Sequence, residues 1–203
     1  GFVGSHLASA LAEDNDVRVL DDLSTGDRSR VPAGAEFIRG DVRDRGLLAR
    51  AMAGVDVVFH EAAVVGVERS VESPRESQSV NVAATLDLLE GARNVGARVV
   101  VASSAAIYGH PGSVPVYESA PKAPTSSYGV DELAVDPCAR LHADLYDPPR
   151  WRSATSTSTT PATPAGATAT SSTSSPNRGV RAATSPSTAT GVRPGTSTTS
   201  RTW

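Results

Sequence analysis

The stretch Gly1-Phe2-Val3-Gly4-Ser5-His6-Leu7 sets two glycines three residues apart at the start of a run of small and apolar residues with helical spacing. Glycine lets the backbone approach a phosphate closely, and a helix N-terminus offers unpaired N–H groups and a positive dipole. The pattern predicts that the backbone of Gly1, Phe2, Val3 and Gly4 binds the pyrophosphate of a dinucleotide. The complete fingerprint has three glycines after a buried strand, so we expect this sequence to begin on the second glycine, without that strand. An ordinary helix start is the alternative.

The next short apolar run, Val17-Arg18-Val19-Leu20, is typical of a strand and ends at Asp21. In a dinucleotide-binding unit, an acid about 20 residues beyond the glycines accepts hydrogen bonds from the adenosine ribose, and its charge repels a 2′-phosphate. We therefore expect Asp21, with the adjacent Asp22, to favour NAD over NADP. A solvated acid at a strand end is the alternative.

Strand and helix patterns then alternate along the chain. The further strands expected are residues 36–39, 57–59 and 99–102. The helices expected pass through residues 47–52 and 80–95, the second with Leu86, Leu88 and Leu89 turned inward. Continuous apolar strands predict a doubly wound α/β fold with a parallel sheet covered on both faces. Ligands of such a sheet bind beyond the carboxyl ends of its strands, where four candidate residues fall: Asp21, Asp41, Ala62 and Ser104.

Composition divides the chain into two unlike parts. Residues 1–150 carry all 22 Asp and Glu against 14 Lys and Arg, hence a net charge of −8, and include the only lysine, Lys122. An acidic, lysine-poor surface is typical of salt-adapted (halophilic) cytoplasmic proteins and argues against nucleic acid as a partner. We expect no membrane span and no secretory signal. The single Cys138 excludes an intrachain disulfide and is expected to be buried or half-buried.

From Trp151 onward the sequence is of another kind. Its 53 residues include 26 Ser and Thr, two Val and no Leu, Ile, Phe, Met, Asp, Glu or Lys. Such a segment cannot bury a core, so we divide the chain into a Rossmann-like domain, residues 1–147, and a tail, residues 148–203, that is disordered or out of frame. A frameshift near Asp147 is favoured, because a shifted reading of GC-rich codons yields Ala, Thr, Ser, Pro and Arg. Without a first strand, its two neighbours would lack a partner, which predicts an aggregating or molten chain.

Further motifs follow the opening glycines in a characteristic order: Asp21 before Ser24-Thr25-Gly26, Gly40-Asp41-Val42-Arg43-Asp44, His60-Glu61-Ala62-Ala63, Asn81 with Thr85, Ser103-Ser104-Ala105-Ala106-Ile107-Tyr108-Gly109 and Ser127-Tyr128-Gly129. Through them, residues 1–147 resemble the extended short-chain dehydrogenase/reductase family, and within it the NAD-dependent epimerases and dehydratases similar to UDP-glucose 4-epimerase. The resemblance implies a Rossmann-type fold, NAD as the cofactor and epimerisation at C4 of a nucleotide sugar of the UDP-hexose class. It also implies a cytoplasmic homodimer.

The resemblance assigns cofactor contacts to individual residues. Asp41 and Val42 would contact adenine, Ala62 and Ala63 would line the cofactor, and Asn81 would hold the active-site loops.

Ser104 and Tyr128 would be catalytic. In the family, a tyrosinate takes the proton of the sugar hydroxyl, the serine hydrogen-bonds the same oxygen, and hydride passes to NAD and returns to the other face of the sugar. No metal takes part, and His60 is expected to be structural.

One position departs from the family pattern. The family has a lysine four residues after its tyrosine, which lowers the pKa of the phenol and binds the nicotinamide ribose. Here that position is Glu132, so we expect this chain to be nearly inactive. Lys122, six residues before Tyr128 in a Pro-flanked loop, is not expected to substitute.

The choice between reaction types depends on another pair of positions. Dehydratases of the family carry an acid pair after the catalytic hydroxyl residue, whereas this chain has Ala105 and Ala106, which favours an epimerase. Another NAD-dependent nucleotide-sugar oxidoreductase or dehydratase is an open alternative, and so is a non-catalytic NAD-binding protein.

Overall fold

A computed structural model describes residues 1–146, 151–153 and 188–194 of the chain. The helices are α1 (Phe2–Leu11), α2 (Arg45–Met52), α3 (Val67–Glu72), α4 (Pro74–Gln78), α5 (Ala84–Val95) and α6 (Ser127–Tyr146). The strands are β1 (Asn15–Asp21), β2 (Glu36–Arg39), β3 (Val57–His60), β4 (Arg98–Val101), β5 (Trp151–Ser153) and β6 (Thr188–Pro194). A π-helical turn, Ser79–Ala83, leads into α5, and a short 3-10 helix, Ala105–Tyr108, follows β4.

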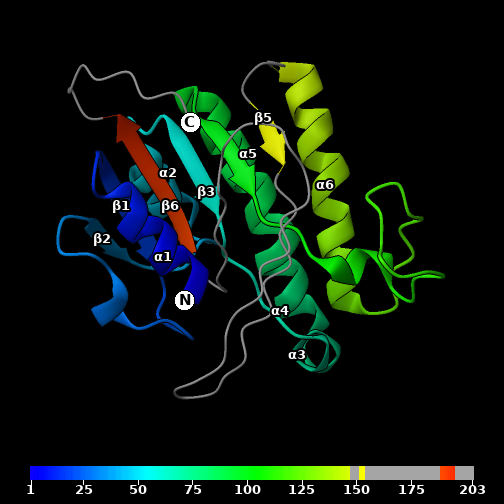
Figure 1. The fold of residues 1–203 in the computed structure, drawn as a ribbon. Coiled ribbons are helices and arrows are strands. Elements are labelled where there is room, and N and C mark those ends of the chain that lie inside the picture. Colours follow the sequence, from blue (N-terminus) through cyan, green and yellow to red (C-terminus); the bar gives the residue numbers. More distant parts are fainter. Residues whose placement is uncertain (147–150, 154–187, 195–203) are drawn as a thin grey trace.

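The strands form one sheet in the order β2-β1-β6-β3-β4-β5 (Figure 1). The pairs β1–β2 and β3–β4 are parallel, as the apolar runs predict, and β4–β5 is parallel as well. In the β3–β4 pair His60 lies opposite Val101, so both strands end at the same edge of the sheet. The α/β class expected from the alternating pattern is confirmed.

The sheet is not wholly parallel, which corrects the expectation of a parallel sheet. β6 lies between β1 and β3 and is antiparallel to both (Figure 1). In a doubly wound sheet of order 3-2-1-4-5-6 this position belongs to the strand before the glycine-rich helix. The two strands expected to lack a partner, β1 and β3, both pair with β6 through their backbones.

Two segments of the tail, β5 and β6, are strands, although we expected no regular structure there. Strand pairing uses backbone N–H and C=O groups, so a composition poor in large apolar side chains does not prevent it. The other residues of the predicted tail lie outside the described part of the chain.

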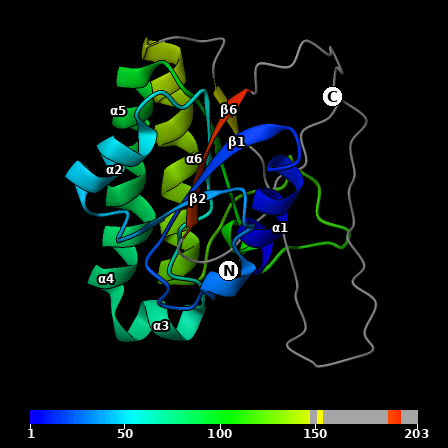
Figure 2. The same ribbon diagram turned by 90° about the vertical axis from the view of Figure 1, so that its left-hand side faces the viewer.

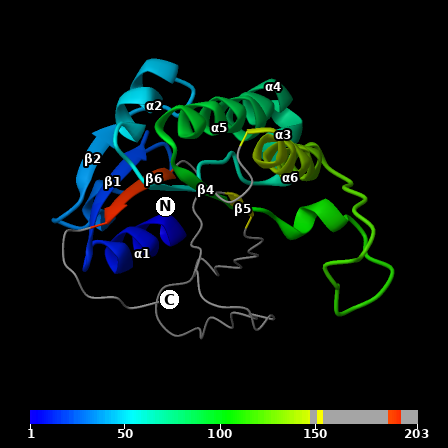
Figure 3. The same cartoon turned by 90° about the horizontal axis from the view of Figure 1, so that it is seen from above.

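Two apolar clusters cover the two faces of the sheet. α1 packs on one face, where Leu7 and Ala8 meet Val17, Val19 and other side chains of the sheet. The remaining helices pack on the opposite face (Figures 2 and 3). The larger cluster lies there and is built from the other side chains of the strands and from the inner faces of α2, α5 and α6. The sheet is therefore covered on both faces, as expected.

The ends of the helices follow local signals. Asp44 caps α2 by accepting a hydrogen bond from the backbone N–H of Leu47 at 2.9 Å, and α5 ends at Gly96 in the left-handed conformation (φ 71°). Leu88 and Leu89 are buried as expected, but Leu86 is 42% exposed. The prediction for Leu86 was wrong because it lies two residues from Leu88, on the opposite side of the helix.

Within the described ranges, no helix is both long enough and apolar enough to span a membrane. Cys138 on α6 is half-buried, as its size and isolation predicted.

Candidate functional site

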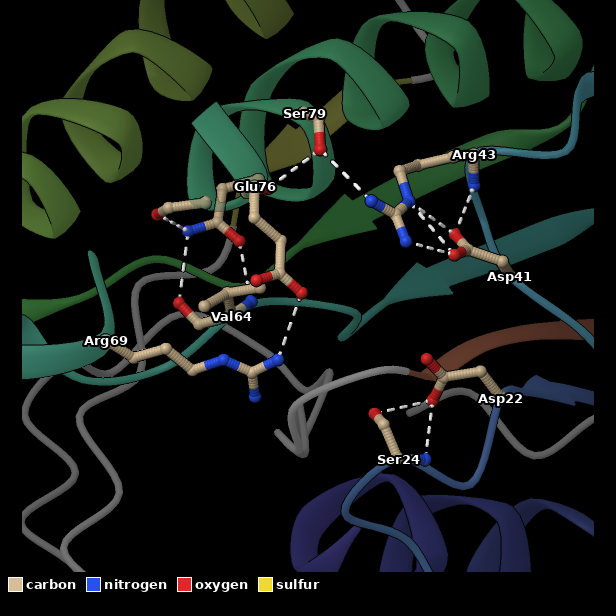
Figure 4. A network of polar contacts seen from close by, with 10 residues as sticks. Asp22, Ser24, Asp41, Arg43, Val64, Arg69, Glu76 and Ser79 are labelled. Atoms are coloured by element: carbon tan, nitrogen blue, oxygen red, sulfur yellow. Dashed lines mark hydrogen bonds and ion pairs between the residues drawn. The ribbon is translucent and has the colours of Figure 1, made fainter. Parts of the chain in front are cut away.

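A pocket with an empty volume of about 500 Å³, part of it open to solvent, lies at the carboxyl ends of β1 and β2. Its lining combines acidic, basic, hydroxyl and small apolar side chains: Asp22, Ser24, Thr25, Gly40, Asp41, Val42, Arg43, Ala63, Val64, Arg69, Glu76 and Val80. Figure 4 shows how the charged members of this set and Ser24 lie relative to one another. The pocket therefore brings the β1 loop, the β2 loop and the loop after β3 to one place, as expected for ligand binding at this edge of the sheet.

The two aspartates that end β1 lie differently. Asp22 lines the pocket, and its Oδ1 accepts hydrogen bonds from the backbone N–H and the hydroxyl of Ser24 at 2.8 and 2.7 Å (Figure 4). Asp21 is only 3% exposed, does not line the pocket, and accepts a hydrogen bond from the backbone N–H of Leu23 at 2.7 Å. Gly26 packs on this carboxylate, since a Cβ there would lie 3.0 Å from Oδ1. Asp21 shapes the loop, while Asp22 faces the pocket.

Asp41 and Arg43 form a closed ion pair on the other wall. Arg43 Nε lies 3.0 and 2.9 Å from the two carboxylate oxygens, and its Nη1 reaches Ser79 Oγ at 3.3 Å (Figure 4). The hydrogen bonds from Arg43 hold the pKa of Asp41 below its usual range. The neighbouring Val42 is buried. The two residues expected to contact adenine therefore both line this pocket.

A second ion pair closes the pocket toward α3 and α4, where Arg69 Nη2 donates to Glu76 Oε1 at 3.1 Å (Figure 4). Sequence reasoning assigned no role to this pair, because its members meet only through the turn between two short helices. Each arginine of the lining is thus paired with an acid, and Asp22 carries the excess negative charge.

Asn81 ties the loop after β3 to the helices. Its side chain accepts from Val64 N–H at 2.7 Å and donates to the Val64 carbonyl at 3.2 Å. The same amide lies 3.3 Å from Ser77 Oγ, which donates to Asp131 on α6 at 2.6 Å. Ser77, Asn81 and Asp131 are all buried. These contacts tie the loop after β3 to α6, while the part expected of Asn81 in an active site stays a prediction. Ser77 and Asp131 were missed because neither belongs to a recognisable motif.

Ser104 and Tyr128 come together at the end of β4. Ser104 begins the 3-10 helix that follows the strand, accepting from Ala106 N–H at 3.2 Å. α6 packs directly on that turn, since a Cβ at Gly129 would lie 2.7 Å from the Ala106 carbonyl oxygen. On the other side, Tyr128 N–H donates to the fully buried Ser70 Oγ at 3.1 Å.

The phenol of Tyr128 has an unfavourable environment for ionisation. Burial raises its pKa to about 12, the carboxyl group of Glu132 adds to the rise, and a hydrogen bond with Ser104 opposes it. Glu132 lies one helical turn further along α6, on the same face. Lys122 cannot compensate, because its ammonium pairs with Asp136 at 2.8 Å. The rise in the phenol pKa expected from Glu132 is therefore present, and its effect on catalysis stays a prediction.

Glu61 stands at the end of β3 and is 2% exposed, and both of its carboxyl oxygens are buried without a hydrogen-bond partner among the described residues. Burial raises its pKa to about 9, and the nearby Glu132 adds to the rise. The preceding His60 is buried with Nε2 at 2.8 Å from Thr85 Oγ1, and burial lowers its pKa to about 4. Its other ring nitrogen, Nδ1, is buried without a hydrogen-bond partner among the described residues, and a structural role for His60 stays a prediction.

The remaining predicted site residues lie outside the pocket lining. Gly4 is buried in α1, Phe2 is 43% exposed with its ring against His6, and the amino group of Gly1 lies 3.7 Å from Asp21 Oδ2. Val3 packs against the smaller apolar cluster. The N-terminus of α1 thus reaches the carboxyl end of β1. Ala62 is buried behind the pocket wall formed by its neighbour Ala63.

Comparison with known proteins identifies the relatives of this chain. Residues 1–189 match the model of the NAD dependent epimerase/dehydratase family. The chain is 48% identical to the UDP-glucose 4-epimerase of Streptomyces lividans over 141 residues, which is 67% of this chain and 43% of that protein. It is 37% identical to a putative UDP-glucose 4-epimerase of Methanocaldococcus jannaschii over 150 residues, 72% of this chain and 49% of that protein.

Solved structures agree. The UDP-glucose 4-epimerase of Brucella ovis in complex with NAD has a TM-score of 0.70 at 34% identity, covering 77% of this chain and 48% of that one. The Thermus thermophilus UDP-glucose 4-epimerase complex with NAD has a TM-score of 0.71 at 37% identity, covering 75% of this chain and 51% of that one. The chain spans about half the length of the relatives that it matches. With its Rossmann-type sheet and the family match over most of its length, the chain belongs to the NAD-dependent epimerase/dehydratase family.

Proposed function

We propose that residues 1–147 are the NAD-binding part of a nucleotide-sugar epimerase-like enzyme. The observation that carries this proposal is a shared edge: the acidic pocket beside β1 and β2 and the Ser104–Tyr128 pair beyond β4 lie along the carboxyl ends of one sheet. A dinucleotide lies along such an edge, with its two halves on either side of the sheet's centre. Relatives solved in complex with NAD support NAD as the ligand.

The pocket suits an adenosine group. Asp22 offers a carboxylate oxygen toward ribose hydroxyls, and its charge disfavours a 2′-phosphate. Arg43 and Arg69 do not offset this preference, because Asp41 and Glu76 already neutralise them. The N-terminus of α1 would face the pyrophosphate with its N–H groups.

At the other end, NAD when bound supplies an acceptor for hydride. The residues of this chain would then handle the proton: Tyr128 would take it from the sugar hydroxyl at its phenol oxygen, and Ser104 would hold that hydroxyl by a hydrogen bond. With the pKa of Tyr128 raised to about 12, little tyrosinate is available near neutral pH. We therefore propose that proton abstraction is impaired in this chain.

The same observation favours a second candidate, a non-catalytic NAD-binding protein. Glu132 separates the two. In the full chain, Glu132→Lys should place an ammonium beside Tyr128 and lower the phenol pKa. Gain of sugar-nucleotide turnover would support the impaired epimerase, and NAD binding without any gain would support the non-catalytic protein.

Binding is the first test of the proposed function. We expect calorimetric titration of the chain to show NAD⁺ binding that is tighter than NADP⁺ binding. Asp22→Asn should reduce that preference, while Asp14→Asn, an exposed acid at the opposite end of β1, should leave it unchanged. If the parent, Asp22→Asn and Asp14→Asn all prefer NAD⁺ to the same degree, Asp22 does not contact the ribose. If neither nucleotide binds, the proposal is refuted.

Three finer assignments belong to the same proposal: a UDP-hexose substrate, a cytoplasmic location and a homodimer. Two large apolar side chains on α6, Leu141 and Leu145, are exposed. They support the homodimer, because a contact with a second copy of the chain would bury them. Light scattering coupled to size-exclusion chromatography would detect it, and a monomeric mass at micromolar concentration would count against it.

A further inference from the structure

The pair formed by Glu61 and Glu132 is the feature of this site that the family pattern does not explain. We propose that these two carboxyl groups make the site selective for the oxidised, cationic form of the nicotinamide dinucleotide over the reduced form. The inference rests on the proposed NAD-binding function and adds which redox state of the dinucleotide the chain binds more tightly.

The first step is the position of the two groups. Glu61 directly follows β3, and Ser104 follows the neighbouring β4, whose residue Val101 is paired with His60. Glu132 lies on α6, one turn after Tyr128 and within hydrogen-bonding reach of its phenol. The two carboxyl groups therefore lie near each other, with Glu132 beside the phenol of Tyr128. If adenosine occupies the pocket beside β1 and β2, the nicotinamide half must extend toward this end of the edge.

The second step concerns the groups that surround the two carboxyls. Glu61 is 2% exposed with both carboxyl oxygens unpartnered among the described residues. Among the described residues, the groups that shift the pKa values of these two carboxyls are acidic or neutral: Glu132 acts on Glu61, and Asp131 and Tyr128 act on Glu132. Asp131 is satisfied by Ser77, and His60 is neutral because burial lowers its pKa to about 4. A buried negative charge without a counter-ion is costly, so a cation placed beside it binds more tightly.

The third step is the charge difference between the two ligands. Oxidised nicotinamide carries a positive charge on its ring and reduced nicotinamide does not, while the rest of the dinucleotide is identical. Burial raises the pKa of Glu132 to about 7, so at pH 8 its carboxylate is mostly ionised. A unit charge about 10 Å from another, at an effective dielectric constant of about 20, changes binding by roughly tenfold or more.

The experiment is a charge series at residue 132, with NAD⁺, NADH and ADP-ribose as probes at pH 8. NADH binding is followed by its fluorescence, and NAD⁺ and ADP-ribose binding by calorimetry. We expect the parent chain to bind NAD⁺ more tightly than NADH, so that the dissociation constant of NADH exceeds that of NAD⁺. Glu132→Gln should reduce the ratio of the NADH constant to the NAD⁺ constant by roughly tenfold. Glu132→Lys should reduce this ratio further. Glu61→Gln should reduce the ratio as the pH rises above 9, where Glu61 ionises.

Two controls separate the outcomes. ADP-ribose lacks the nicotinamide, so its affinity should be the same in every variant, and Glu13→Gln, an exposed acid at the far end of β1, should leave the ratio unchanged. Unchanged ADP-ribose binding together with a constant ratio across the charge series would overturn the inference while leaving the proposed function intact. If the parent chain binds neither ADP-ribose nor NAD⁺, the proposed function is refuted and this inference with it.

Discussion

The burial of Glu132 has a consequence for stability that can be measured without any ligand. A carboxyl group with a folded-state pKa of about 7, against an ordinary value of 4.5, holds its proton more tightly in the folded chain than in the unfolded one. Its contribution to stability is therefore fully present below pH 4.5 and is lost as the pH rises through about 7. Between pH 5 and pH 8 this loss amounts to about 2.5 kcal/mol.

Glu132→Gln removes the titration but keeps the size and hydrogen-bonding capacity of the side chain. The variant should gain about 2.5 kcal/mol in unfolding free energy, relative to the parent, between pH 5 and pH 8. Urea unfolding followed by far-ultraviolet circular dichroism at intervals of half a pH unit measures this difference. Glu13→Gln, which is exposed, provides the matched control and should track the parent.

A difference between Glu132→Gln and the parent that stays flat from pH 5 to pH 8 would refute the reasoning, because it would mean that Glu132 ionises in the folded chain as it does in water. A difference that falls with pH would indicate a partner cation for the carboxylate. A partner cation would remove the uncompensated charge on which the redox selectivity inferred above rests, whereas a flat difference would leave Glu132 ionised at pH 8.

Three further predictions concern local stability, each measured as a change in urea unfolding. Asp44→Ala removes the cap of α2 and should cost about 1 kcal/mol; no change would show that the first turn is held by packing alone. Leu88→Ala at a fully buried position should cost about 2–5 kcal/mol, whereas Leu86→Ala on the exposed side of α5 should cost well under half as much; equal costs would contradict the orientation of the helix. Gly109→Ala should be strongly destabilising, because φ is +58° and its Cβ would overlap a backbone carbonyl, while Gly112→Ala, with open space around it, should be close to neutral.

Much of the fold follows from local pattern. The strand at residues 36–39 has the predicted bounds, and β1, β3 and β4 differ from prediction by only one or two residues at an end. The reason is that an apolar run bounded by polar turns specifies a buried strand without reference to the rest of the chain. The positions of Asp41, Ala62 and Ser104 beyond strand ends followed in the same way.

The largest omission is long-range, whereas the errors at Leu86 and at the end of β1 are local. β6 pairs through backbone groups with strands that lie more than 120 residues away in sequence. No side-chain pattern therefore predicted this strand. Of the two aspartates after β1, only Asp22 lines the pocket, because successive side chains of an extended backbone point to opposite sides.

The sequence by itself determined the α/β class, the family, the edge of the sheet that carries the site and the unusual acid at residue 132, because each depends on residue type and short-range spacing. Only the tertiary structure decided that Glu61 lies beside Glu132, that Asn81 and Ser77 link the loop after β3 to Asp131, and that Arg43 and Arg69 are both neutralised. Those relations depend on where α6, α3 and α4 pack on the sheet. The electrostatics of a buried site is a sum over neighbours in space, and spacing along the chain does not reveal them.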